Sequence, residues 1–342
     1  MHMADALISP AVGGAMWAAT AGLTVYSARK LKASIGDQKT PLMGVLGAFI
    51  FAAQMINFTI PATGSSGHLG GGMILAILLG PHAAFLTMVS ILTVQALFFA
   101  DGGLMALGCN IFNLGFFPCF VAYPLIYRRF AGRRLTQARI LFGSILACVV
   151  GLQLGASGVV LETSFSGVSE LPLRTFALLM LPIHLAIGIV EGLVTAAVVT
   201  FIWRARPEIV EAASVAGPTA KLSMRKVFVG FLVLTALTAG TLSWFASTHP
   251  DGLEWSVFHA TGKEELTPPN KEVHSLFAKL QEKTAFLPDY GFKDAASEPP
   301  AKEETWPAVN AGKSVAGILG VAITLAFAAL IGIGLQRFRK ER

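Results

Sequence analysis

The sequence predicts an all-α fold, a polytopic helical membrane protein with about seven membrane helices followed by two C-terminal ones. Hydrophobic residues make up 54% of the 342 residues, charged residues only 13%, and the mean hydropathy is +0.64. A soluble protein of this length has about a quarter of its residues charged. The apolar residues also gather in long runs, at 7–28, 41–60, 72–100, 104–127, 140–161, 173–203, 226–247 and 314–336. Runs of this length are typical of membrane helices.

The basic residues between these runs predict the orientation. Lysine and arginine cluster in four segments, which are 29–40, 128–139, 205–225 and the tail 337–342. Cytoplasmic loops carry an excess of these residues, so we expect all four segments inside the cell. The N-terminus then lies outside, the C-terminus inside, and the chain is a multi-pass protein of the cytoplasmic membrane. No Lys or Arg precedes the first run, and we do not read it as a removable signal peptide.

The run 72–100 is broken by Gly80-Pro81-His82. Proline inside a helix loses a hydrogen bond and clashes with the preceding turn. The orientation also requires this run to cross the membrane twice or not at all. We therefore expect a short helix over 72–80 and a full one over 82–100. The short helix is too short to span the bilayer alone and has to be surrounded by protein. Interrupted segments of this kind often line binding sites in transporters.

The C-terminal third differs in composition. We expect one membrane region over 1–205, a polar cytoplasmic linker over 206–225, and a second region over 226–342 with two membrane helices. These two helices flank an extracytoplasmic segment, 248–312, which holds 11 acidic residues against 6 lysines. Within 271–286, apolar residues at helical spacing predict one short amphipathic helix in an otherwise irregular loop domain.

The first two residues offer a metal chelate. The Met1 amine, the deprotonated His2 amide and the His2 imidazole Nδ1 can bind one metal through a five- and a six-membered ring. A fourth nitrogen would complete a square plane, the geometry that favours Ni(II) or Cu(II). The candidate is His68, because the glycine-rich loop 61–72 can fold into a pocket and aim its ring. The alternative is an incidental histidine in a disordered tail and another in a flexible surface loop.

Other polar residues have two readings each. The acidic residues near the outer face either attract a cation or end helices; these are Asp5, Asp101 and Glu162. His184 and Glu191 lie two turns apart on one face; they are either functional or simply paired, with each other or with a neighbouring helix. The amides at i,i+3 spacing either join helices or orient a metal-bound imidazole; these are Gln54 with Asn57 and Asn110 with Asn113. For His82, helix capping or packing is the favoured role.

Met1-His2-Met3-Ala4-Asp5, the Ser9-Pro10 helix start and the His68 loop resemble the nickel/cobalt substrate-binding membrane subunits (NikM/CbiM type) of energy-coupling-factor ABC transporters. Pro250-Asp251-Gly252-Leu253-Glu254 resembles the motif of their small accessory subunit (NikN/CbiN-like). The chain therefore resembles a fusion of the two, which implies a metal-binding membrane subunit over 1–205 and an accessory subunit-like region over 226–342. The resemblance implies metal capture for an ATP-driven importer of nickel or cobalt. Square-planar nitrogen ligation favours Ni(2+), but low-spin Co(2+) can adopt it too and stays the alternative cargo. The resemblance implies a square-planar site of Met1, His2 and His68. It also implies as partners a transmembrane coupling (T) subunit and cytoplasmic ATPase subunits.

Two other classes of protein compete with this interpretation. A stand-alone, ion-coupled secondary transporter would need intramembrane relays, for which only His184 and Glu191 are available. An intramembrane metalloprotease would need a His-Glu-x-x-His motif, which the sequence lacks. Gly312-Lys313-Ser314 ends like a phosphate loop, but Pro307 stands where its first glycine belongs. We therefore expect a transporter subunit that is no enzyme and holds no cofactor or catalytic residue.

Overall fold

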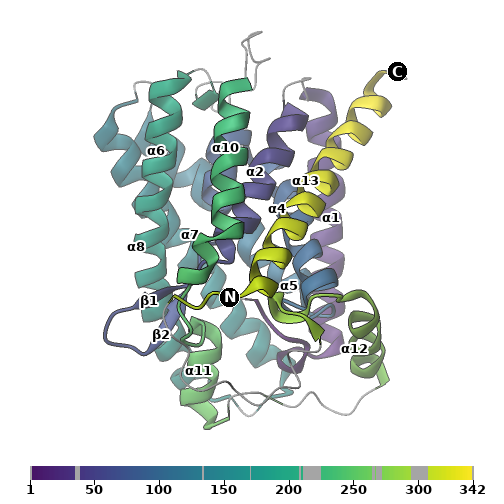
Figure 1. Cartoon of the computed structure of the whole chain (residues 1–342). Helices are drawn as coiled ribbons and strands as arrows, with labels where there is room; N and C mark the ends of the chain where they lie inside the picture. The colour runs from purple at the N-terminus through teal and green to yellow at the C-terminus, as the bar shows by residue number, and fades with distance from the viewer. Residues whose placement is uncertain are drawn as a thin grey trace.

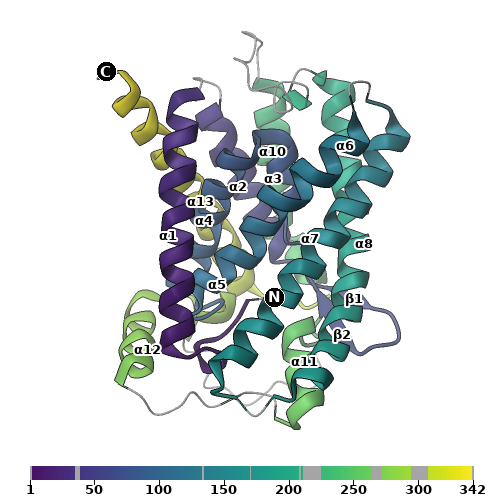
Figure 2. The same ribbon diagram turned by 180° about the vertical axis from the view of Figure 1, so that it is seen from behind.

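The computed structural model describes residues 2–34, 39–132, 135–169, 171–207, 209–210, 225–263, 266, 272–293 and 307–340. These residues form a bundle of roughly parallel long helices, with a layer of short elements across one end (Figures 1 and 2). The N-terminus lies at this layered end and the C-terminus at the opposite end (Figure 1). The predicted all-α class therefore holds, apart from one small hairpin.

The elements follow the apolar runs closely. In the first two thirds of the chain they are η1 (Asp5–Leu7), α1 (Pro10–Ser34), α2 (Lys39–Gln54), β1 (Phe58–Ile60), β2 (Ser65–Gly67), α3 (Gly72–Leu79), α4 (Pro81–Phe99), α5 (Leu107–Ile111), the π-helix η2 (Phe112–Tyr127), α6 (Arg128–Ala131), α7 (Gln137–Ser166) and α8 (Leu173–Ala205). The last third contains α10 (Arg225–Gly240), η3 (Leu242–Phe245), α11 (Gly252–Thr261), α12 (Glu272–Thr284), η4 (Pro288–Tyr290) and α13 (Ala311–Lys340).

Among the described residues, five helices are long and apolar enough to cross a membrane. They are Pro81–Phe99, Leu107–Ala131, Gln137–Ser166, Leu173–Ala205 and Ala311–Arg337. This supports a polytopic membrane protein but gives a lower number than the expected seven plus two. Helices α2 and α10, at 16 residues each, fall below the length of about 20 residues that a bilayer core requires.

The predicted break in the run 72–100 is confirmed. Helix α3 ends at Leu79, Gly80 has a positive φ of 79°, and Pro81 begins α4. All eight residues of α3 are buried, as expected for a helix that cannot span the bilayer alone. Helix α3 packs against α4, η2 and α8, and its N-terminus follows directly after the His68 loop.

Two expectations for shorter segments are corrected. The run 41–60 is helical only to Gln54. Its last residues, Phe58–Ile60, form a strand that pairs antiparallel with Ser65–Gly67 in a hairpin. The segment 248–312 contains the predicted amphipathic helix, α12, but also a further helix, α11, that was not expected. Helix α11 begins with a capping box, in which Asp251 accepts from the backbone N–H groups of Leu253 and Glu254 and the Glu254 side chain accepts from Asp251 N–H.

The C-terminal region, from residue 225 onward, packs against the rest of the chain both along the long helices and at the layered end. Helices α10 and α13 lie against α2. At the layered end, Ser66 N–H donates to Pro250 O at 2.8 Å, and Ser247 N–H donates to Asn57 O at 2.7 Å. The Gln281 amide donates to the backbone of Ala96 and Gly102. Most of the predicted linker, residues 211–224, lies outside the described residues.

Candidate metal centre

The N-terminal segment is ordered from His2 onward and lies inside the layered end of the bundle. Met3 and Ile8 are fully buried. The Met3 N–H donates to Asn110 Oδ1 at 2.8 Å, and the Met3 carbonyl accepts from Asn110 Nδ2 at 3.2 Å. Asp5 accepts from Ala106 N–H at 2.9 Å. The reading of a disordered tail is therefore wrong for these residues, whereas Met1 lies outside the described residues.

The structure brings His2 and His68 together. Their rings stack with centroids 5.0 Å apart and an interplanar angle of 13°. Burial lowers the pKa of both imidazoles, that of His68 to about 3. Both rings are therefore neutral at physiological pH, which is the form in which imidazole binds a metal. His68 Nδ1 hydrogen-bonds to Leu69 O at 3.1 Å, so its proton lies on Nδ1 and Nε2 is the ring's acceptor nitrogen.

Three glycines around His68 lie where a Cβ atom would clash; at Gly72 it would lie 2.7 Å from the Leu114 backbone oxygen. A Cβ atom on Gly67 would lie 2.5 Å from a side-chain carbon of Ile187. Gly71 has a φ of 76°, in the left-handed region, and a Cβ there would lie 2.5 Å from an Ile50 side-chain carbon. The glycines therefore let the loop pack closely into the bundle and are not a sign of a loose surface loop.

Buried polar side chains hold this loop. Glu191 on α8 accepts from Gly70 N–H at 2.8 Å and from Gly71 N–H at 3.0 Å. Gln54 on α2 donates to Gly70 O at 2.8 Å, and Gln95 donates to Gln54 Oε1 at 2.9 Å. Glu191 therefore pairs with this loop, so the reading in which His184 and Glu191 pair with each other is not observed. Sequence reasoning assigned neither Glu191 nor Gln95 to this loop, because their partners lie far away in the chain.

The remaining candidates have mixed outcomes. Asn110 holds the N-terminal segment, but Asn113 donates to Glu162 at 2.7 Å, away from it. The His184 ring bonds to Met180 O of its own helix. His82 packs between the rings of Tyr26 and Phe120, which is the packing role that we favoured.

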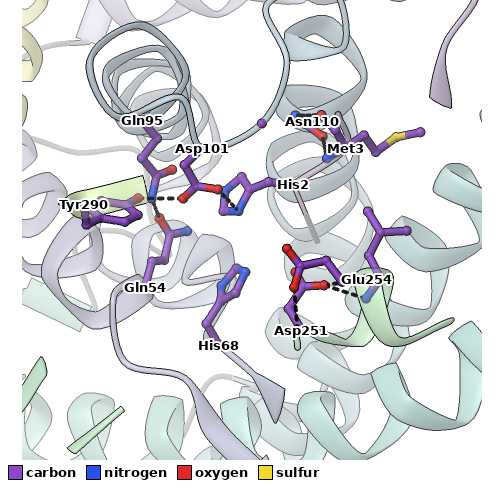
Figure 3. Close-up of polar contacts among 12 residues, drawn as sticks. His2, Met3, Gln54, His68, Gln95, Asp101, Asn110, Asp251, Glu254 and Tyr290 are labelled. Carbon is purple, nitrogen blue, oxygen red and sulfur yellow. Dashed lines mark hydrogen bonds and ion pairs between the residues drawn. The ribbon is translucent and has the colours of Figure 1, made fainter. Parts of the chain in front are cut away.

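A cavity of about 270 Å³ adjoins the two histidines. Its polar lining comes from both regions of the chain and includes His2, His68, Asp101, Asp251, Glu254 and Tyr290. Figure 3 shows His2 with its ring turned toward Asp101, His68 beside it, and Asp251 with Glu254 across the cavity. The His2 Nδ1 atom lies 3.1 Å from Asp101 Oδ1. Sequence reasoning noted Asp101 but missed Asp251 and Tyr290.

Within the described ranges, no three His, Cys, Asp or Glu side chains are grouped so that they could hold a metal ion. Two imidazoles, those of His2 and His68, lie side by side. The arrangement is thus a pair of imidazoles beside a polar cavity that carboxylates also line, at the layered end of the bundle.

Comparison with known proteins identifies the family. The profile described as "Cobalt uptake substrate-specific transmembrane region" matches residues 2–209, and the PDGLE domain profile matches residues 225–337. This chain belongs to the cobalt uptake substrate-specific transmembrane family. The resemblance to a NikM/CbiM-type subunit fused to a NikN-like one is confirmed.

Relatives in this family share both regions. The "Putative fused nickel transport protein NikMN" of Archaeoglobus fulgidus is 32% identical, over 99% of this chain and 99% of its own length. The "Fused nickel transport protein NikMN" of Rhodobacter capsulatus is 30% identical, over 98% and 97% of the two chains. A solved structure titled "Crystal Structure of an Truncated Transition metal Transporter" has a TM-score of 0.54 and 31% identity, and covers 60% of this chain and 99% of that one. The names of these relatives describe transport proteins and not enzymes.

Proposed function

We propose that this chain captures a divalent transition metal at the outer face of the cytoplasmic membrane, as the substrate-specific component of an ATP-driven energy-coupling-factor importer. Ni(II) is the preferred cargo and Co(II) the alternative. The ligands are the Met1 amine, the His2 amide and imidazole, and the His68 imidazole. In this division of the chain, residues 1–205 hold the metal, residues 206–225 link the halves, and residues 226–342 act as the accessory half.

The stacking of His2 on His68 carries this proposal. Both neutral rings lie in one buried pocket. The backbone nitrogen of His2 is near them because it belongs to the same residue as one of the rings. Four nitrogens in a plane are the donor set that low-spin Ni(II) prefers. The names of the fused NikMN relatives support nickel, and cobalt transport proteins in the same family, such as the CbiM of Sorangium cellulosum, support the alternative.

The coupling to ATP rests on separate partners, a transmembrane T subunit and cytoplasmic ATPases. The alternative, a stand-alone secondary transporter, loses support because both Glu191 oxygens accept backbone hydrogen bonds. A carboxylate held in this way stabilises a loop and is poorly placed to relay ions.

A titration of the purified full chain with Ni(II) and with Co(II) tests the site. His2→Ala and His68→Ala are each expected to abolish high-affinity binding while the protein stays folded, because each supplies an in-plane nitrogen. His82→Ala removes a histidine outside the pocket and should bind like the wild type. A folded His2→Ala protein that binds nickel with unchanged affinity would contradict the ligand assignment.

The orientation has its own test. Single cysteines placed in 248–263 should react with a membrane-impermeant reagent added to intact cells, and single cysteines in the loop 128–139 should not. The reverse pattern would overturn the outside position of the metal site.

A further inference from the structure

Tyr290 in the C-terminal region lies beside the metal centre of the N-terminal region. It ends η4, and its ring stacks on Phe99 of α4 with centroids 5.0 Å apart and an interplanar angle of 16°. The backbone is strained here, because Asp289 and Tyr290 both have positive φ angles, 49° and 59°. Two consecutive non-glycine residues in this region are costly and persist only where the surroundings impose them. The surrounding structure therefore holds the Tyr290 ring in this position.

Asp101 connects Tyr290 to His2. The Tyr290 hydroxyl donates to Asp101 Oδ2 at 2.6 Å, and the other carboxylate oxygen, Oδ1, lies 3.1 Å from His2 Nδ1. Figure 3 shows the three side chains in a row. A hydroxyl-to-carboxylate bond of this length is charge-assisted and about twice as strong as a neutral one. Since both oxygens are engaged, the carboxylate has a fixed direction, and with it the His2 ring.

The ring orientation matters because the chelate uses Nδ1. That atom now faces Asp101, whereas Nε2 is buried and has no hydrogen-bond partner among the described residues. Rotation about the last side-chain bond alone, a torsion with two broad minima, would bring Cδ2–H and not Nε2–H to Asp101. The loaded state therefore needs a change in both side-chain torsions of His2 and a transfer of the ring proton from Nδ1 to Nε2 through solvent. Nδ1 is then free to bind a metal, and Nε2–H can turn toward Asp101. Metal-bound imidazoles usually donate their remote N–H to a carboxylate in this way.

We propose that Tyr290, acting through Asp101, is a positioning residue for the His2 imidazole, so that the C-terminal region completes the metal centre of the N-terminal one. In the present structure Asp101, fixed by Tyr290, contacts Nδ1 of His2. In the metal-loaded state the same carboxylate accepts a hydrogen bond from Nε2–H. The proposal rests on the proposed function, because it assumes that His2 binds the metal. It gives the accessory half a direct effect on metal affinity that is separate from any effect on assembly with partners.

The test uses conservative variants of the full chain in detergent. Tyr290→Phe keeps the ring on Phe99 and removes only the hydroxyl. Tyr127→Phe is the matched control, since its buried hydroxyl has no hydrogen-bond partner among the described residues. Nickel affinity is measured by calorimetric titration, the geometry of the bound ion by its visible absorption spectrum, and folding by the Tm of the metal-free protein.

We expect Tyr290→Phe to bind nickel about 10-fold more weakly and to shift the absorption of the bound ion, with little change in Tm. Asp101→Asn should weaken binding by about 10- to 100-fold, the usual effect of removing such a partner. If Tyr290 acts through Asp101, the double variant should bind no more weakly than Asp101→Asn alone, because coupled residues are not additive. Tyr127→Phe should match the wild type in all three measurements.

Three results separate the possible failures. If Tyr290→Phe keeps the wild-type affinity and spectrum while His68→Ala abolishes binding, the positioning role is refuted and the metal site stands. If the two single losses simply add in the double variant, Tyr290 does not act through Asp101 and the proposal also fails. If the wild type binds neither nickel nor cobalt, the proposed function fails first, and the positioning role with it.

Discussion

Asn110 is the residue whose loss should most directly release the N-terminal chelate. The Asn110→Ala variant removes both hydrogen bonds to the Met3 backbone. The Met3 carbonyl keeps a bond from Gly103 N–H at 2.9 Å, but the fully buried Met3 N–H is left without its acceptor. Leaving a buried donor unsatisfied costs about 1–3 kcal/mol.

This cost sets the expected loss of affinity. At about 1.4 kcal/mol for each factor of ten, it corresponds to nickel binding weakened by about 5- to 140-fold. The loss reaches the upper value when the N-terminal segment leaves its place in the metal-free variant and has to be ordered again on binding. The measurement is a calorimetric nickel titration of the purified variant, with Tm recorded alongside.

Asn113→Ala is the matched control. Asn113 lies one turn further along, is 1% exposed like Asn110, and donates to Glu162 instead of the N-terminal segment. Its loss should lower Tm, because it deprives a buried carboxylate of a hydrogen bond, but should leave nickel affinity within about twofold of the wild type. Equal weakening by both variants, or none by Asn110→Ala, would refute the reasoning.

Three further predictions follow from the same contacts. A residue added before Met1, and shown to be retained, should abolish nickel uptake by cells that carry the partner subunits, whereas a tag after Arg342 should not; full uptake by the extended chain would exclude the amine as a ligand. Glu191→Gln should weaken nickel binding about 10-fold, because the amide NH₂ cannot accept from one of the Gly70 and Gly71 N–H groups, and unchanged affinity would mean that the loop holds itself. Burial raises the pKa of the Asp5 carboxyl above its ordinary value of 3.8, so the folded state binds the Asp5 proton more tightly than the unfolded state does. Asp5 therefore lowers the free energy of unfolding as the pH rises above about 3.8, and the Tm of Asp5→Asn minus that of the wild type should increase from low to neutral pH; a constant difference would contradict this.

The sequence by itself determined the features that depend on local patterns. The Gly80-Pro81 break, the short buried helix before it and the amphipathic α12 follow from proline chemistry and from apolar spacing, and the structure has all three. The pairing of His2 with His68 also came from the sequence, because the chelate chemistry demanded one more imidazole on the same side of the membrane. Helix α11 was missed although Asp251 and Glu254, three residues apart, carry a readable capping-box signal.

Only the tertiary structure decided what surrounds the two histidines. Apolar spacing tells which face of a helix is buried but not which distant residue covers it. The contacts of Asp101 with Tyr290 and of Gly70 with Glu191 join residues 189 and 121 positions apart, and no local pattern encodes such pairs. Buried polar groups must find partners wherever the packed helices provide them. The packing of the C-terminal region against the hairpin and α4 therefore makes Asp101 and Tyr290 neighbours of the metal centre.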